Sequence, residues 1–113
     1  GQLEGARFMR VRAEQALFVN ANVRLCDFSR ANLKQAQFTG ADCELVRFNE
    51  ADLTYLDFSH AKLDYADLSN TQLYYAKLHE VSENGTLWRG ANRNQATETD
   101  PERQKAESFN PAG

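Results

Sequence analysis

Apolar residues recur at every fifth position along most of this chain. Sixteen consecutive blocks of five cover residues 1–80 without an insertion, and the third residue of every block is apolar. These third positions are Leu3, Phe8, Ala13, Phe18, Val23, Phe28, Leu33, Phe38, Cys43, Phe48, Leu53, Phe58, Leu63, Leu68, Leu73 and Leu78. Neither an α-helix, with 3.6 residues per turn, nor a plain strand, with a period of two, keeps such residues on one face. The pattern therefore predicts a repetitive chain that turns a corner every five residues.

The first position of each block is usually small. It is alanine at residues 6, 16, 21, 31, 36, 41, 51, 61, 66 and 76, and the largest exception is Leu56. Charged and amide side chains dominate the other three positions. We therefore expect the first and third positions to face a common interior and the second, fourth and fifth positions to face water.

Several blocks begin with a recognisable triplet. Ala-Asp-Leu or Ala-Asn-Leu opens the blocks at residues 31, 51 and 66, and close variants open those at 21, 26 and 41. This motif resembles the pentapeptide-repeat family. The resemblance implies an all-β fold, a right-handed quadrilateral β-helix with four pentapeptides per coil, and hence about four coils followed by a short C-terminal cap or helix.

With twenty residues per coil, residues twenty apart should stack at the ~4.8 Å spacing of hydrogen-bonded strands. Two of the resulting columns are aromatic. One contains Phe8, Phe28, Phe48, Leu68 and Trp88, and the other contains Phe18, Phe38, Phe58 and Leu78. The aspartates at second positions, residues 27, 42, 52, 57 and 67, are expected to hydrogen-bond the backbone of their turns.

The repeat weakens after Glu80, because Glu83 and Arg93 occupy third positions. We predict a solenoid over residues 1–96, with a partial fifth coil in which Trp88 covers Leu68. A polar tail follows over residues 97–113, with a possible short helix that starts near Pro101. Because the repeat is already in phase at Gly1, the chain is expected to be a fragment of a longer polypeptide.

Composition and charge argue against several classes of function. The net charge of −3 argues against binding to nucleic acid or to an anionic membrane surface. No apolar run approaches the ~20 residues of a membrane span and no signal-peptide pattern opens the chain, so a cytoplasmic location is expected. Cys26 and Cys43 lack metal-site and redox spacing and are interpreted as reduced core thiols.

Catalytic and cofactor sites are not expected. A filled solenoid has no cleft in which catalytic groups could converge on a small-molecule substrate, so we predict no enzyme, no cofactor and no metal. His60 and His79 fall at outward positions and are interpreted as solvated surface residues.

Outward apolar residues at twenty-residue spacing are the candidate partner-binding site. Leu25, Leu45 and Tyr65 share one corner, and Tyr55 and Tyr75 share the opposite corner, with Tyr74 beside them. Exposed apolar stripes of this kind often mark interfaces. The expected partner is another protein or the rest of a longer polypeptide, and a surface without a role is the remaining alternative.

The leading functional hypothesis is a non-catalytic protein–protein interaction or scaffold module that forms a domain of a larger bacterial protein. The resemblance extends to adaptors and effectors linked to bacterial secretion. Because some family members inhibit DNA gyrase as DNA mimics, the alternative is a topoisomerase-binding protein that uses the acidic half of the chain. That half contains Glu44, Glu50, Asp52, Asp57, Asp64 and Asp67. A third hypothesis is a rigid spacer attached to an enzyme.

Overall fold

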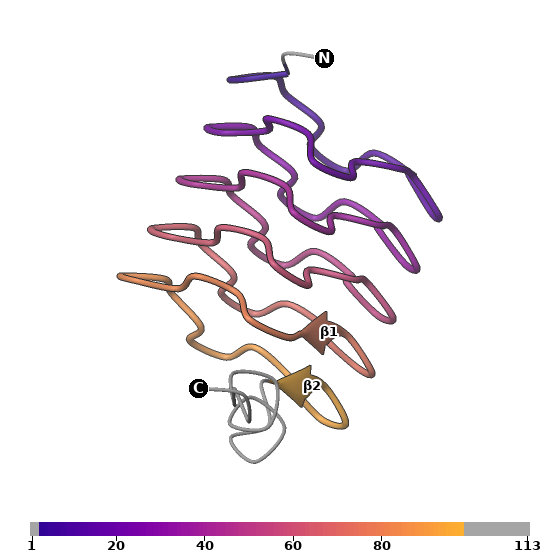
Figure 1. Ribbon diagram of the computed structural model, residues 1–113. Coiled ribbons are helices and arrows are strands. Elements are labelled where there is room, and N and C mark those ends of the chain that lie inside the picture. Colours follow the sequence, from indigo (N-terminus) through magenta and orange to yellow (C-terminus); the bar gives the residue numbers. More distant parts are fainter. Residues whose placement is uncertain (1–2, 99–113) are drawn as a thin grey trace, which may run out of the picture.

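The computed structural model describes residues 3–98, which wind into a solenoid of stacked coils (Figure 1). Parallel bridges join second-position residues twenty apart, from Arg7 with Asp27 to Gln72 with Asn92. In the last coil the bridge lengthens, so that strand β1 (Lys77–Leu78) pairs with strand β2 (Thr97–Glu98). Four pentapeptides therefore complete one coil, as in the predicted quadrilateral β-helix.

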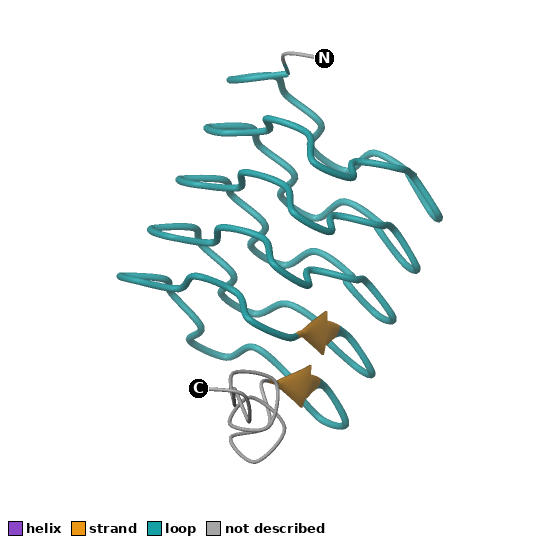
Figure 2. Ribbon diagram, viewed as in Figure 1, coloured by secondary structure: helices purple, strands orange, loops and turns teal. Residues whose placement is uncertain are grey.

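The rest of the described chain consists of turns and single bridges (Figure 2). Each face of a coil is too short for a longer strand, since the chain turns after every five residues. Residues 3–98 contain no helix of the length and apolar character that crossing a bilayer requires.

One set of backbone hydrogen bonds repeats in nearly every pentapeptide. In the block Cys26 to Arg30, the amide of Phe28 donates to the carbonyl of Arg47 at 2.7 Å, and that of Arg30 donates to Asn49 at 3.0 Å. The amide of Ala31 then closes the turn by donating to Phe28 at 3.0 Å. The first two bonds join adjacent coils, so the backbone of each coil is held by its neighbours.

The fifth position of each pentapeptide has a left-handed backbone. Its φ lies between 53° at Glu80 and 77° at Gly5, and most of these residues are not glycine. A positive φ at the third residue of a four-residue turn is the feature of a type II turn, and it allows the sharp corner.

The predicted role of the second-position aspartates is confirmed. Oδ1 of Asp27 accepts the fourth-position amide of Ser29 at 2.9 Å, and Asp42, Asp52, Asp57 and Asp67 accept the equivalent amide in their own turns. Asparagine does the same at residues 22, 32 and 92. These side chains satisfy an amide that the ladder between coils does not use.

The core consists of the side chains at the first and third positions of the pentapeptides, as predicted. From Val23 to Leu78 every first and third position is buried. Stacked rings follow one another at 4.9 Å from Phe8 to Phe28 and at 5.5 Å from Phe28 to Phe48. The second aromatic column meets the first edge to face across the interior, at 5.8 Å between Phe28 and Phe38. Both aromatic columns are therefore confirmed.

Leu56 departs from the small-residue rule and is nevertheless fully buried, so the interior near the third coil accommodates a larger first-position side chain. Cys26 and Cys43 are buried free thiols, as expected.

The fifth coil is more regular than predicted, because its backbone continues through Glu98 and pairs with the fourth coil throughout. Its inward side chains are polar as well as aromatic. The guanidinium of Arg93 lies 4.3 Å from the ring centre of Trp88 and forms an ion pair with Glu98. The pairing between the fourth and fifth coils thus includes Thr97 and Glu98, which directly follow the predicted boundary at residue 96. The predicted C-terminal cap or helix lies outside the described residues.

Candidate interaction surface

Three of the predicted partner-binding residues share one corner of the solenoid. Leu25, Leu45 and Tyr65 occupy fifth positions of successive coils, and their exposed fractions are 52%, 45% and 63%. The amide of Leu25 donates to Glu44 and that of Leu45 donates to Asp64, both at 3.1 Å, so these turns are bonded one to the next. We call Leu25, Leu45 and Tyr65 the leucine–tyrosine ridge.

A glycine limits this ridge at its C-terminal end. Gly85 occupies the next fifth position, and a Cβ atom built there would lie 2.6 Å from ring atoms of Tyr65. The Tyr65 ring therefore lies over Gly85, in space that any other residue would need for its side chain.

A row of charged residues runs beside the leucine–tyrosine ridge. The guanidinium of Arg24 lies 3.8 Å from the carboxylate of Glu4 and 3.7 Å from that of Glu44. Farther along, Asp64 accepts hydrogen bonds from the Ser82 hydroxyl at 2.8 Å and from a backbone amide. An apolar stripe with a polar border resembles the core and rim of a protein interface.

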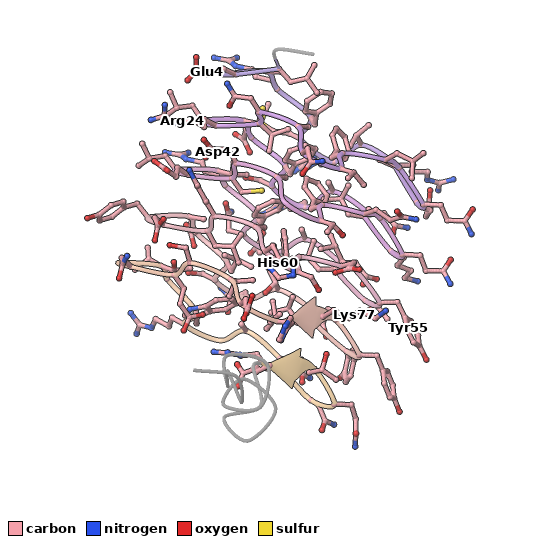
Figure 3. All side chains as sticks on the ribbon, viewed as in Figure 1. Glu4, Arg24, Asp42, Tyr55, His60 and Lys77 are labelled. Carbon is pink, nitrogen blue, oxygen red and sulfur yellow. The ribbon has the colours of Figure 1, made fainter. Side chains whose placement is uncertain are left out.

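The opposite corner carries the second predicted group. The rings of Tyr55 and Tyr75 stack in parallel, with centroids 5.0 Å apart and planes 8° apart, and both side chains are about half exposed. Figure 3 shows Tyr55 on the side of the solenoid opposite Arg24, which precedes Leu25. We call Tyr55 and Tyr75 the tyrosine ridge.

Polar side chains, mostly glutamines, surround the tyrosine ridge. It borders a groove of about 540 Å³ whose other lining residues are Gln15, Gln35, Gln37 and Lys77. Gln15 donates to Gln35 at 3.0 Å along the same corner. Tyr74 is only partly exposed, and its hydroxyl accepts a hydrogen bond from Asn92 at 2.7 Å. Tyr74 is thus tied to the solenoid itself.

The residues of both ridges share the left-handed backbone of the other fifth positions. Leu25 and Leu45 have φ of 62°, and Tyr55, Tyr65 and Tyr75 have φ between 58° and 61°. A side chain with a Cβ atom in this region costs about 1 to 2 kcal/mol relative to the right-handed region. Glycine stands at the same position of other turns, so the fold does not require bulky apolar residues there.

The structure also brings together three residues that the sequence analysis had kept apart. His60 is exposed and His79 is partly exposed, and both lie beside Glu80 at one corner. The missed signal was the spacing: residues 60 and 80 are twenty apart, and His79 precedes Glu80.

The fold and its ridges define a class: a β-helical solenoid with a filled core, built to present side chains on flat faces and corners. Residues 6–42 and 51–82 match the family described as pentapeptide repeats, in eight copies. The chain therefore belongs to the pentapeptide-repeat family. None of the curated proteins compared with it matches.

Two solved structures are similar to this chain. A pentapeptide repeat protein from the thylakoid lumen of Arabidopsis thaliana is 29% identical, with a TM-score of 0.85 over 91% of this chain and 72% of that one. The pentapeptide repeat protein Rfr23 from the cyanobacterium Cyanothece 51142 is 17% identical, with a TM-score of 0.49 over 86% of each chain.

Proposed function

We propose that this chain is a non-catalytic protein–protein interaction module and that its partner binds the leucine–tyrosine ridge. The observation that carries the proposal is the alignment of Leu25, Leu45 and Tyr65 in three successive coils, each about half exposed or more. Apolar side chains at this corner are exposed and contribute little to the core, so the solenoid itself does not require them. A partner that buries the ridge would recover the hydrophobic free energy that the isolated solenoid leaves unused.

The leucine–tyrosine ridge is preferred to the tyrosine ridge for a chemical reason. Tyr55 and Tyr75 already cover one face of each other's ring, and glutamine amides surround them. The leucines have no polar atom, so only burial against another surface removes them from water.

The partner is another protein or another part of a longer polypeptide. A cytoplasmic adaptor linked to bacterial secretion, as the sequence resemblance implied, is one form of this function. The similar solenoid from Arabidopsis thaliana is a protein of the thylakoid lumen, which is a different compartment. A cytoplasmic location is therefore part of our proposal for this chain.

The test is comparative capture from a cell extract. The wild-type chain, the double variant L45E/Y65E and the matched control Y55E/Y75E are immobilised in parallel. We expect the same captured protein with wild type and control and its loss with L45E/Y65E, followed by direct binding measurements with the purified protein. Unchanged capture by L45E/Y65E would overturn the assignment of the ridge. Melting curves establish that both variants fold.

The DNA-mimic alternative ranks second because many of its acids are already engaged. Glu44 lies 3.7 Å from Arg24, and Glu50 accepts a hydrogen bond from Arg30 at 2.5 Å. Asp52 lies 3.6 Å from Lys34 and also accepts the turn amide of Thr54. Acids with these partners form a weaker phosphate-like track than unpaired ones would. A gyrase supercoiling assay with the purified chain tests this alternative. Inhibition of supercoiling would favour the DNA mimic over the interaction module.

A further inference from the structure

A cluster of metal-ligating side chains occupies one corner between the two ridges. His60 is at the fifth position of one turn, and His79 and Glu80 are at the fourth and fifth positions of the turn one coil later. One ligand atom from each, an imidazole nitrogen or a carboxylate oxygen, lies within 4.8 Å of the other two. We call these three residues the histidine corner. Figure 3 labels His60 on the face between Arg24 and Tyr55.

The backbone holds the two turns of the histidine corner together. The amide of His60 donates to the carbonyl of His79 at 2.9 Å, so the two turns cannot separate without breaking the ladder between coils. The left-handed φ of 61° at His60 and 53° at Glu80 is part of the same repeated corner. The residues therefore lie on a rigid part of the solenoid, which lowers the entropy cost of assembling a ligand set.

The side chains already approach a ligand geometry. Nδ1 of His60 lies 3.2 Å from Oε2 of Glu80, and the rings of His60 and His79 meet edge to face at 5.4 Å. Ligands about 2.0 to 2.1 Å from a tetrahedral zinc ion are roughly 3.3 Å apart. The His60–Glu80 pair matches that separation, and rotation of exposed side chains can bring the third ligand atom closer.

The chemistry of the set is that of a transition-metal site. Two imidazoles and one carboxylate hold zinc in sites with an open fourth position, and imidazole also suits Cu²⁺ and Ni²⁺. The side chains of His60 and Glu80 are 55% and 35% exposed. An arriving ion therefore has access from solvent.

We propose that His60, His79 and Glu80 bind one divalent transition-metal ion of the zinc type, with three protein ligands and a solvent-filled fourth position. The ion would cross-link the third and fourth coils at this corner. Because it binds the folded chain, it would also raise the melting temperature as its concentration rises. The site does not depend on the proposed partner-binding ridge, which lies on another corner.

The experiment is a titration of the tag-free full chain with Zn²⁺, and separately with Co²⁺, followed by calorimetry and by the visible absorption of bound Co²⁺. We expect one ion per chain and a higher melting temperature with metal. His60→Ala, His79→Ala and Glu80→Gln should each weaken binding ~10-fold or more, since even indirect changes at metal sites cost that much.

Glu50→Gln is the matched control, because Glu50 is also an exposed glutamate at a fifth position and lies on a different corner. Its affinity for the ion should equal that of wild type. Absence of binding by wild type, or equal binding by wild type and the two histidine variants, would overturn the proposal. Melting curves without metal show whether each variant folds.

Discussion

The aspartate at the second position of a pentapeptide stabilises its own turn by accepting the fourth-position amide. Burial alone would raise the pKa of Asp27. Hydrogen bonds from the Ser29 hydroxyl and amide, together with the positive charges of Arg47 and Arg7, outweigh burial and lower that pKa. The folded state therefore favours the carboxylate, as expected for a charge that accepts two hydrogen bonds.

Asp27→Asn tests this account through pH. Since the folded pKa lies below the unfolded value of 3.8, the carboxylate stabilises the fold above that pH, and the stabilisation is lost as pH falls through the folded pKa. Asparagine accepts the same amide at residues 22 and 32, so the variant should stay within about 1 kcal/mol of wild type at pH 7. Its free energy of unfolding, measured in urea, should fall less steeply below pH 4. An equal slope in both proteins would contradict the assignment.

The element of this fold is the coil, whose interior is held by columns of stacked rings. Phe48 is fully buried, stacks on Phe28 and meets Phe38 and Phe58 edge to face at 5.8 and 5.4 Å. Each coil contacts only its neighbours, so a gap in one column weakens two interfaces at once.

Phe48→Ala should therefore strongly destabilise the fold. The loss of a buried ring and the remaining cavity predict a cost of ~3 to 5 kcal/mol in the free energy of unfolding. The matched control is Arg47→Ala, because Arg47 is the adjacent residue and is exposed. Thermal and urea unfolding of the two variants gives the comparison. A melting temperature for Phe48→Ala equal to or above that of Arg47→Ala would contradict the inward register.

At the scale of the whole molecule, burial varies along the axis. Inward residues of the first coil, such as Phe8 and Phe18, are partly exposed, whereas those from Val23 to Leu78 are buried. In a solenoid, local opening starts from the coils with fewer buried contacts. Two cysteines report on this gradient. The thiol of Cys26 donates to the carbonyl of Leu3 in the first coil, and Cys43 lies one coil further in.

We expect a thiol reagent to modify Cys26 faster than Cys43 in the native protein. Burial raises the pKa of both thiols, and raises that of Cys43 well above its usual value, so neither forms the reactive thiolate readily in the closed state. Modification must then follow opening of the coil. The variant Cys43→Ala reports on Cys26, and Cys26→Ala reports on Cys43. The labelling rate of each native variant, divided by its rate when unfolded in urea, measures how often the coil around that thiol opens. Faster labelling of Cys43 would contradict a gradient from the first coil.

The period of five by itself determined which residues enter the interior, because sixteen apolar third positions at this spacing can face inward only if the chain turns a corner every five residues. The column of Leu25, Leu45 and Tyr65 required in addition four pentapeptides per coil, which the family resemblance implied and the bridges between residues twenty apart confirm. Tertiary structure decided what depends on contacts between coils: the ordered fifth coil with Arg93 beside Trp88, and the meeting of His60, His79 and Glu80. The sequence places these residues in neighbouring coils, but hydrophobic periodicity does not say which polar or charged side chains meet. Their partners are set by the direction in which each corner points them.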